Sequence, residues 1–290
     1  MKPQHIGDIT VNRLVEVEGP LFDAAVLLPD SSPEAFRAQA DWLAPQFYDL
    51  EGDNMLMSIH AFVVQTPHHT ILIDTCCGND KNRPARPDFS MLDGPFLDNL
   101  QGLGVAPEAV DFVMCTHLHF DHVGWNTRLT DGEWVPTFPN AKYLFSRADV
   151  DHFENMDPDG NHSESYRDSV LPVIAAGQAV VIDSDHALDD TVWIEPAPGH
   201  TPGNYCVRVA SGDTGAVFSG DVLHHPVQCA HPEWSSRACI DPDQSRITRA
   251  AFLDNYAETD TTVFAAHFPG PTAGTVVNGG ENLRFRLRGD

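Results

Sequence analysis

The densest group of potential metal ligands in this sequence lies at residues 116–122, where the order His-x-His-x-Asp-His places His117, His119, Asp121 and His122 together. Because side chains alternate along an extended strand, the first three point to one side, and a turn after the strand can bring in His122. Imidazole and carboxylate groups are the usual ligands of zinc and similar divalent ions. The motif therefore predicts a metal site, although a chain with 15 histidines also places some of them together by chance.

Three more ligand-type residues stand where an apolar segment meets a loop. His200 lies in a loop rich in Gly and Pro, Asp221 follows the apolar residues 217–218, and His267 follows residues 263–266. A rigid sheet can hold a side chain firmly at such a strand end. Each residue alone is better explained by a capping or surface role, but together with the first motif they indicate additional ligands.

The elements that must position these residues follow from apolar patterning. Residues 110–115 form the expected strand that leads into the motif. Other strands are expected at 55–65, 70–74, 142–145, 179–182, 191–196, 204–209, 216–219 and 262–266, and helices at 95–103, 146–155, 163–176 and 242–256, with a polar bend at 157–162. Runs of strands separated by helices predict an α+β class in which two mixed sheets pack face to face with helices outside. We expect residues 1–290 to form a single domain.

The composition limits the classes of partner. The chain has 290 residues and 17 Lys+Arg against 42 Asp+Glu, which gives a formal net charge of −25. Such a charge repels nucleic-acid phosphates and anionic membranes, so we expect neither as a partner. Six cysteines without a Cys-x-x-Cys pair argue against a disulfide framework, and no apolar segment is long enough to span a membrane. These features predict a cytoplasmic protein.

The complete residue set resembles the metallo-β-lactamase superfamily from about Val11 to the last strand. The resemblance implies an αββα sandwich with a site for two divalent metal ions at the edge between its sheets. It assigns His117, His119 and His200 to one ion, Asp121, His122 and His267 to the second ion, and Asp221 to a bridge between the two. It also makes Asp74 an acid that orients a ligand histidine, unless Asp74 is only a strand-end turn residue. Ligands of these types suit zinc, manganese, iron and cobalt alike, and zinc is the metal that we expect.

The motif details favour the lactonase, arylesterase and methyl parathion hydrolase-like branch of the superfamily. His119 stands where flavodiiron relatives usually carry an acid, and Asp221 stands where the true β-lactamases carry a cysteine ligand. Acyl-homoserine lactonases often have a Tyr shortly after the bridging Asp. In this chain, His224 follows Asp221 by three residues and precedes Gln228, which is more similar to the methyl parathion hydrolase group.

The resemblance implies a dinuclear hydrolase that cleaves a small-molecule ester or lactone by attack of a metal-bridging hydroxide. Asp121 is the expected proton shuttle, and His224 is expected to donate a hydrogen bond or a proton to the oxyanion or the leaving group, unless it only packs. Expected apolar residues of the pocket wall are Phe89, Met91, Phe120, Trp125, Phe153 and Trp234.

Three alternatives to the ester or lactone hydrolase stay open. They are a phosphotriester hydrolase, a mononuclear iron dioxygenase, and a binding or sensor protein without turnover. The complete ligand set argues against the last two, since both would need fewer ligands. The sequence leaves open whether the chain is a monomer or a homodimer.

Overall fold

The computed structural model describes residues 2–157 and 163–288. The chain divides into two compact units. Unit 1 comprises Met1–Gly7, Val17–Ser58 and Ala187–Asp290, and unit 2 comprises Asp8–Glu16 and Ile59–His186. The expectation of a single domain over residues 1–290 stays a prediction. The polar bend expected at 157–162 lies, apart from Asp157, outside the described residues.

Unit 2 contains a mixed sheet in which β2, β5, β6, β7, β10 and β11 follow one another. Strands β6, β7, β10 and β11 run parallel, whereas β5 and β6 are antiparallel. The strands are β2 (Ile9–Gly19), β5 (Met57–Gln65), β6 (Thr70–Ile73), β7 (Phe112–Met114), β10 (Lys142–Ser146) and β11 (Ala179–Ile182), with a separate hairpin of β8 (Thr127–Thr130) and β9 (Glu133–Pro136). The strand expected at 110–115 is thus shorter than predicted but lies directly before the His-rich motif.

The helices of unit 2 are short. They are η1 (Pro87–Phe89), α4 (Phe96–Gly102), η2 (Pro107–Ala109), α5 (Phe120–Val123), η3 (Gly124–Asn126), α6 (Arg147–Glu154), α7 (Ser163–Ser165), η4 (Tyr166–Val170) and α8 (Leu171–Ala175). The helix predicted at 146–155 is α6. The helix predicted at 163–176 is interrupted, because η4 is a π-helical turn between α7 and α8.

Unit 1 contains a six-stranded sheet in the order β12-β13-β14-β15-β16-β17, in which only β14 and β15 pair in parallel. The strands are β12 (Val192–Pro196), β13 (Tyr205–Ser211), β14 (Thr214–Phe218), β15 (Thr262–Phe264), β16 (Ala273–Asn278) and β17 (Leu283–Leu287). The remaining elements are β1 (Gln4–Ile6), α1 (Ala24–Leu27), α2 (Pro33–Ala38), α3 (Ala40–Leu43), β3 (Tyr48–Asp49), β4 (Asn54–Met55), η5 (Gly220–Val222), α9 (Val227–Ala230) and α10 (Pro242–Tyr256).

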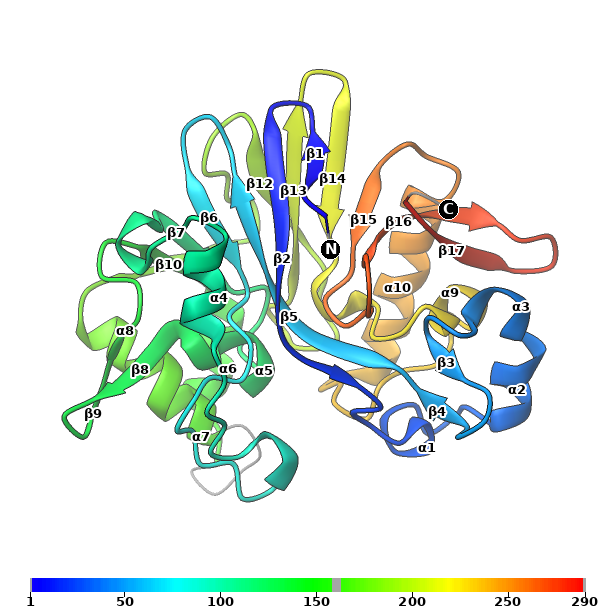
Figure 1. Ribbon diagram of the computed structural model, residues 1–290, viewed down its shortest axis with the longest axis horizontal. Helices are drawn as coiled ribbons and strands as arrows, with labels where there is room; N and C mark the ends of the chain where they lie inside the picture. Colours follow the sequence, from blue (N-terminus) through cyan, green and yellow to red (C-terminus); the bar gives the residue numbers. More distant parts are fainter. Residues whose placement is uncertain (1, 158–162, 289–290) are drawn as a thin grey trace. The chain divides into compact units, whose positions relative to one another are not determined.

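The longest helix among the described residues, α10, was predicted from its sequence and lies beside β16 (Figure 1). It begins at Pro242 because the Asp241 side chain accepts a hydrogen bond from the backbone N–H of Gln244, and proline at the first helical position needs no such acceptor. Its inner face carries Phe252 and Leu253 into the hydrophobic core of unit 1. The α+β class predicted from the element pattern is therefore observed in both units.

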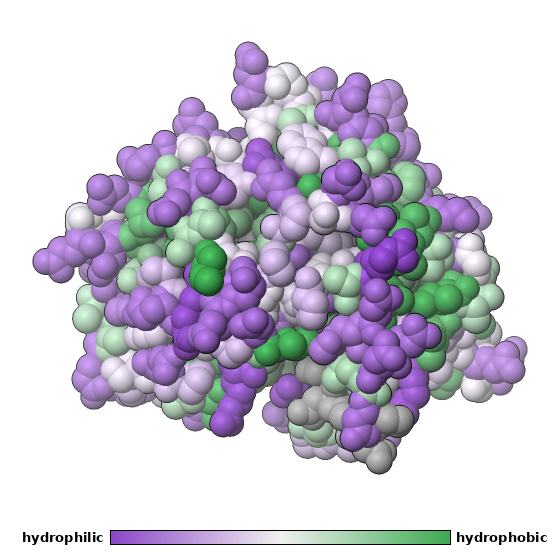
Figure 2. Space-filling view, turned by 180° about the vertical axis from the view of Figure 1, so that it is seen from behind, coloured by the Kyte–Doolittle hydropathy of each residue, from purple (hydrophilic) through white to green (hydrophobic). Residues whose placement is uncertain are grey.

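Figure 2 shows many hydrophilic residues on the visible face, with groups of hydrophobic residues between them, in keeping with the net charge of −25. Among the described residues, no helix has both the length and the hydropathy needed to cross a membrane. All six cysteines are buried free thiols.

Candidate metal centre

The His-rich motif of unit 2 lies where the sequence places it, between a strand end and a short helix. His117 and His119 follow β7, whereas Asp121 and His122 lie on α5. The three imidazoles are 0–3% exposed, and the ring of His117 lies 4.7 Å from that of His119 and 4.0 Å from that of His122. An Asp121 carboxylate oxygen lies 3.9 Å from His122 Nε2. The motif therefore gathers its four ligand-type side chains within one unit.

Asp74 supports this group from the adjacent strand end. It follows β6 with a φ of 59° and accepts hydrogen bonds from the backbone N–H of Thr116 at 2.7 Å and from His122 Nδ1 at 2.9 Å. Because Asp74 accepts the Nδ1 proton of His122, the Nε2 lone pair is left for a metal ion. The structure thus places Asp74 where the sequence analysis expects an orienting acid.

Unit 1 builds its own cluster around one carboxylate. Asp221 lies in η5 directly after β14, where its Oδ2 is 3.1 Å from His200 Nε2 and 3.3 Å from His224 Nε2. Its Oδ1 is 3.1 Å from His267 Nε2, beyond the end of β15. All four side chains are at most 4% exposed. One buried carboxylate therefore faces three imidazoles, which come from different strand ends.

The hydrogen bonds of His267 test whether this cluster suits a cation. His267 Nδ1 lies 3.0 Å from the Ser58 carbonyl oxygen, which can only accept, so Nδ1 carries the proton. The Nε2 atom of a neutral His267 then presents a lone pair to the lone pairs of Asp221. Two acceptor atoms 3.1 Å apart repel each other unless a proton or a metal ion lies between or beside them. The donor set therefore fits a divalent cation.

Two imidazoles of the cluster, those of His200 and His224, have pKa values that are shifted in opposite directions. Burial alone would lower the pKa of His200, but the neighbouring Asp221 carboxylate outweighs burial and raises this pKa to about 9. Burial lowers the pKa of His224 to about 4, because Asp221 compensates only in part. Without a cation, His200 is thus the imidazole that takes the proton beside Asp221. A metal ion takes the place of such a proton when it binds.

The loop that carries His200 is fixed against the start of α10. Gly199 has a φ of +127°, and a Cβ atom there would lie 2.3 Å from the backbone nitrogen of Ser245. The backbone N–H groups of Ile240 and Asp241 donate to the carbonyl oxygens of His200 and Gly199, each at 2.9 Å. Only glycine allows this approach, so the Gly-Pro character of the loop has a direct structural purpose.

His224 is held through its backbone. The Gln228 side chain accepts from the His224 N–H at 2.7 Å and donates to the Trp234 carbonyl oxygen at 2.8 Å. The neighbouring His225, in contrast, turns its Nε2 to the carbonyl oxygen of Phe47 at 2.8 Å and packs in the core. Of these two adjacent histidines, only His224 joins the Asp221 cluster.

The six expected wall residues divide into two groups. Phe89 and Phe153 lie near the motif, since their rings are 5.6 Å from Phe120 and 6.0 Å from His119 respectively. Trp125 instead stacks on Phe96 and donates to Glu16 at 2.7 Å. Trp234 belongs to the core of unit 1, and Met91 is 60% exposed. Packing within the protein interior therefore explains the positions of the two tryptophans.

Sequence reasoning missed a buried cation that anchors the loop at 78–95. Lys81 is 0% exposed and donates to Thr127 Oγ1 at 2.6 Å, and its ammonium lies 3.4 Å from the ring centre of Trp134. Arg83 forms two hydrogen bonds with Asp168, at 2.6 and 2.9 Å. Nothing in the local pattern marks this lysine, because its partners are distant in sequence. Buried polar contacts thus hold this loop, which also carries Phe89; its role as a pocket wall stays a prediction.

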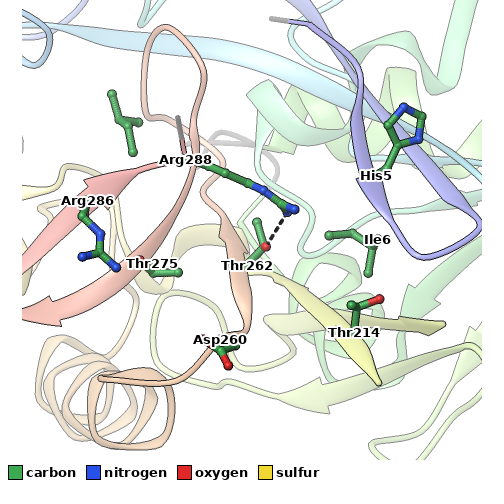
Figure 3. A pocket seen from close by; sticks show the side chains of 10 residues that line it. His5, Ile6, Thr214, Asp260, Thr262, Thr275, Arg286 and Arg288 are labelled. Carbon is green, nitrogen blue, oxygen red and sulfur yellow. Dashed lines mark hydrogen bonds between the residues drawn. The ribbon is translucent and has the colours of Figure 1, made fainter. Parts of the chain in front are cut away.

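Unit 1 has a separate pocket that involves none of the predicted ligands. Its volume is about 380 Å³, and its lining residues come from β1, the start of β14 and the segments around β15–β17 (Figure 3). Arg288 donates to Thr262 Oγ1 at 2.9 Å across it. The candidate metal ligands are therefore not part of this pocket.

Comparison with protein families places most of the chain in one of them. The family described as the metallo-beta-lactamase superfamily matches residues 55–267, a range that includes all seven predicted ligands. Among curated proteins, an N-acyl homoserine lactonase from a Bacillus species is 24% identical over 179 residues, or 58% of this chain. The matched region spans 64% of the length of that relative.

Solved structures agree over almost the whole chain. The hydrolase AbOPH is 25% identical, with a TM-score of 0.80 over 99% of this chain and 96% of its own. AidC, described as a dizinc quorum-quenching lactonase, is 21% identical, with a TM-score of 0.77 over 100% of this chain and 97% of its own. These likenesses confirm the predicted fold.

Proposed function

Because the chain belongs to the metallo-β-lactamase superfamily, we propose that it is a hydrolase that binds two divalent metal ions, most simply zinc, and cleaves an ester or lactone. The observation that carries this proposal is the buried Asp221 carboxylate, which faces three imidazoles. A carboxylate in such a position can bridge two cations. Without bound cations, three uncharged imidazoles would give the buried carboxylate no comparable stabilisation.

The proposal keeps the ligand set that the family resemblance implies. In it, His117, His119 and His200 would hold one ion, Asp121, His122 and His267 would hold the other, and Asp221 would be shared by the two. All seven proposed ligands lie within residues 55–267, the range that the family model matches. The Nδ1 contacts of His122 and His267 support it further, since both leave Nε2 for a metal ion. The proposal also treats both units as parts of a single domain.

Bound divalent ions would supply Lewis acidity toward the substrate oxygen and make water nucleophilic near neutral pH. The chain's own residues do the rest. Asp121 has two carboxylate oxygens and can hold a proton on the one that is not used as a ligand. His224, fixed by Gln228 beside Asp221, donates a hydrogen bond to the oxyanion that develops on the substrate. Phe120 and Phe153, next to His119, exclude water from an apolar group of the substrate.

Esters and lactones are the favoured substrates. Several curated relatives of this chain are called N-acyl homoserine lactonases, although one is called a hydroxyacylglutathione hydrolase, and AidC is described as a lactonase. Phosphotriester hydrolysis is the second candidate, because the Asp221-x-x-His224 spacing is similar to that of the methyl parathion hydrolase group. A small-molecule substrate belongs to this proposal, while a homodimer and a cytoplasmic location stay predictions.

A small substrate panel tests the proposal. It contains an aryl ester, an acyl-homoserine lactone, an aliphatic lactone and a phosphotriester, each measured before and after treatment with a chelator. Chelator-sensitive hydrolysis of an ester or lactone is the expected result, and a preference for the phosphotriester would favour the second candidate. One iron per chain without hydrolysis would contradict both and favour the dioxygenase alternative.

A further inference from the structure

A cysteine lies directly behind one of the proposed ligands. The Cys239 Sγ atom is 3.5 Å from His200 Nδ1 and 3.4 Å from Ser245 Oγ. Cys239 is 8% exposed and His200 is 2% exposed, so water reaches neither side chain freely. All three residues belong to unit 1.

The direction of these hydrogen bonds follows from the other side of the imidazole. His200 Nε2 faces Asp221 at 3.1 Å, so it is the atom available to a metal ion, and the ring proton then resides on Nδ1. The Nδ1–H group donates to Cys239 Sγ, and the S–H group donates to Ser245 Oγ. We propose that Cys239 is the positioning residue for His200, holding its ring through Nδ1 with Nε2 directed to the metal site.

A buried arginine fixes the thiol and the bridging carboxylate from the same helix. Arg249 is 0% exposed and lies four residues after Ser245 on α10, so the two share one helix face. Its Nη2 donates to Ser245 Oγ and its Nε to the Val222 carbonyl oxygen, each at 2.9 Å. Val222 directly follows Asp221. This face of α10 therefore positions His200 through Cys239 and the segment of Asp221 through Val222.

The thiol differs from the groups that support the other proposed ligands. His122 is supported by a carboxylate and His267 by a carbonyl oxygen, and both are stronger acceptors than a thiol sulfur. Outer partners of this kind commonly change metal affinity about 10-fold to 100-fold. The inference rests on the proposed function, because it takes His200 as a ligand of one of two metal ions.

Three variants test the role of Cys239. Cys239→Ala removes the Nδ1 partner, Cys239→Ser keeps a hydroxyl there, and Cys229→Ala is the control, since Cys229 is buried in the core on α9. Metal-free proteins are titrated with zinc against a competing chelator. We expect Cys239→Ala to lower the affinity for one of the two zinc ions about 10-fold to 100-fold. Cys239→Ser should recover part of that affinity, and the control should match the wild type.

A spectroscopic measurement keeps the test valid if Cys239→Ala does not fold. In zinc-loaded wild-type protein labelled with ¹⁵N-histidine, the His200 Nδ1–H should give a protected proton resonance. Ser245→Ala, which removes the acceptor of the thiol, should shift that resonance, whereas Cys229→Ala should not. The positioning role would be overturned if the wild type binds two zinc ions and the Cys239 and Ser245 variants keep both zinc affinities and the wild-type resonance. A wild type that binds no zinc pair would instead overturn the proposed function.

Discussion

The two ligand clusters are built in different ways. In unit 2, four ligand-type residues lie within His117–His122, on one strand end and one short helix. In unit 1, His200, Asp221 and His267 come from three separate strand ends, and long-range contacts bring them together. A local motif can be recognised from spacing alone, whereas a dispersed cluster depends on the register of a whole sheet. The structure of the unit 1 cluster therefore adds the most information beyond what the sequence alone predicts.

The largest effect is expected at the centre of the dispersed cluster. Asp221→Asn keeps the shape of the side chain but removes the charge that faces three imidazoles. We expect the variant to lose at least one of two metal equivalents and nearly all turnover, as measured by elemental analysis and by the hydrolysis assay. Asp183→Asn, an exposed change on unit 2, serves as the control. Full metal content in Asp221→Asn would show that the carboxylate is not a bridge.

A smaller effect, on turnover alone, is expected for the fourth member of that cluster. His224→Ala should lower kcat by about 10²-fold to 10⁴-fold, because it removes a hydrogen-bond donor to the developing oxyanion. Metal content should stay the same, since His224 is not among the proposed ligands. Unchanged kcat would remove His224 from the mechanism, and loss of a metal ion would make it a ligand.

Asp74→Asn provides the corresponding test on the local cluster. Asp74 accepts the Nδ1 proton of His122 at 2.9 Å, and an amide in its place is a weaker, uncharged acceptor. Zinc affinity should decrease about 10-fold to 100-fold in competition titrations, while the fold persists. If affinity is unchanged, Asp74 is only the turn residue that its φ of 59° also allows.

Two buried imidazoles of unit 1 should also give the metal-free protein a pH-dependent stability. Burial lowers the folded-state pKa of His224 and His225 to about 4, below the unfolded value of about 6.5. Between these values the unfolded chain binds more protons, so stability decreases as pH falls from about 6.5 toward 4. Each imidazole contributes a loss of roughly 2–3 kcal/mol. Urea titrations at pH 6.5 and pH 4.5 should show this decrease in the free energy of unfolding, and His224→Ala should reduce it. An equal decrease in the wild type and the variant would contradict the assignment.

The sequence was most informative where structure depends on near neighbours. The amphipathic pattern of residues 242–256 and the apolar strand before the His-rich motif are both local signals, so both elements were predicted correctly. Cys239 carried no such signal, because its contact with His200 spans 39 residues and depends on how a loop packs against α10. The burial of Lys81 likewise depends on Thr127 and Asp168, which lie far along the chain. Long-range packing of this kind has no local signature.

The most direct test of the account is the metal content of the purified wild-type protein. Elemental analysis after gel filtration should find two divalent ions per chain, and stripping with a chelator should release both. A content of two, restored when zinc is added back, is the result that the dinuclear account predicts. A single ion that no added metal raises to two would contradict it, whatever substrate the protein hydrolyses.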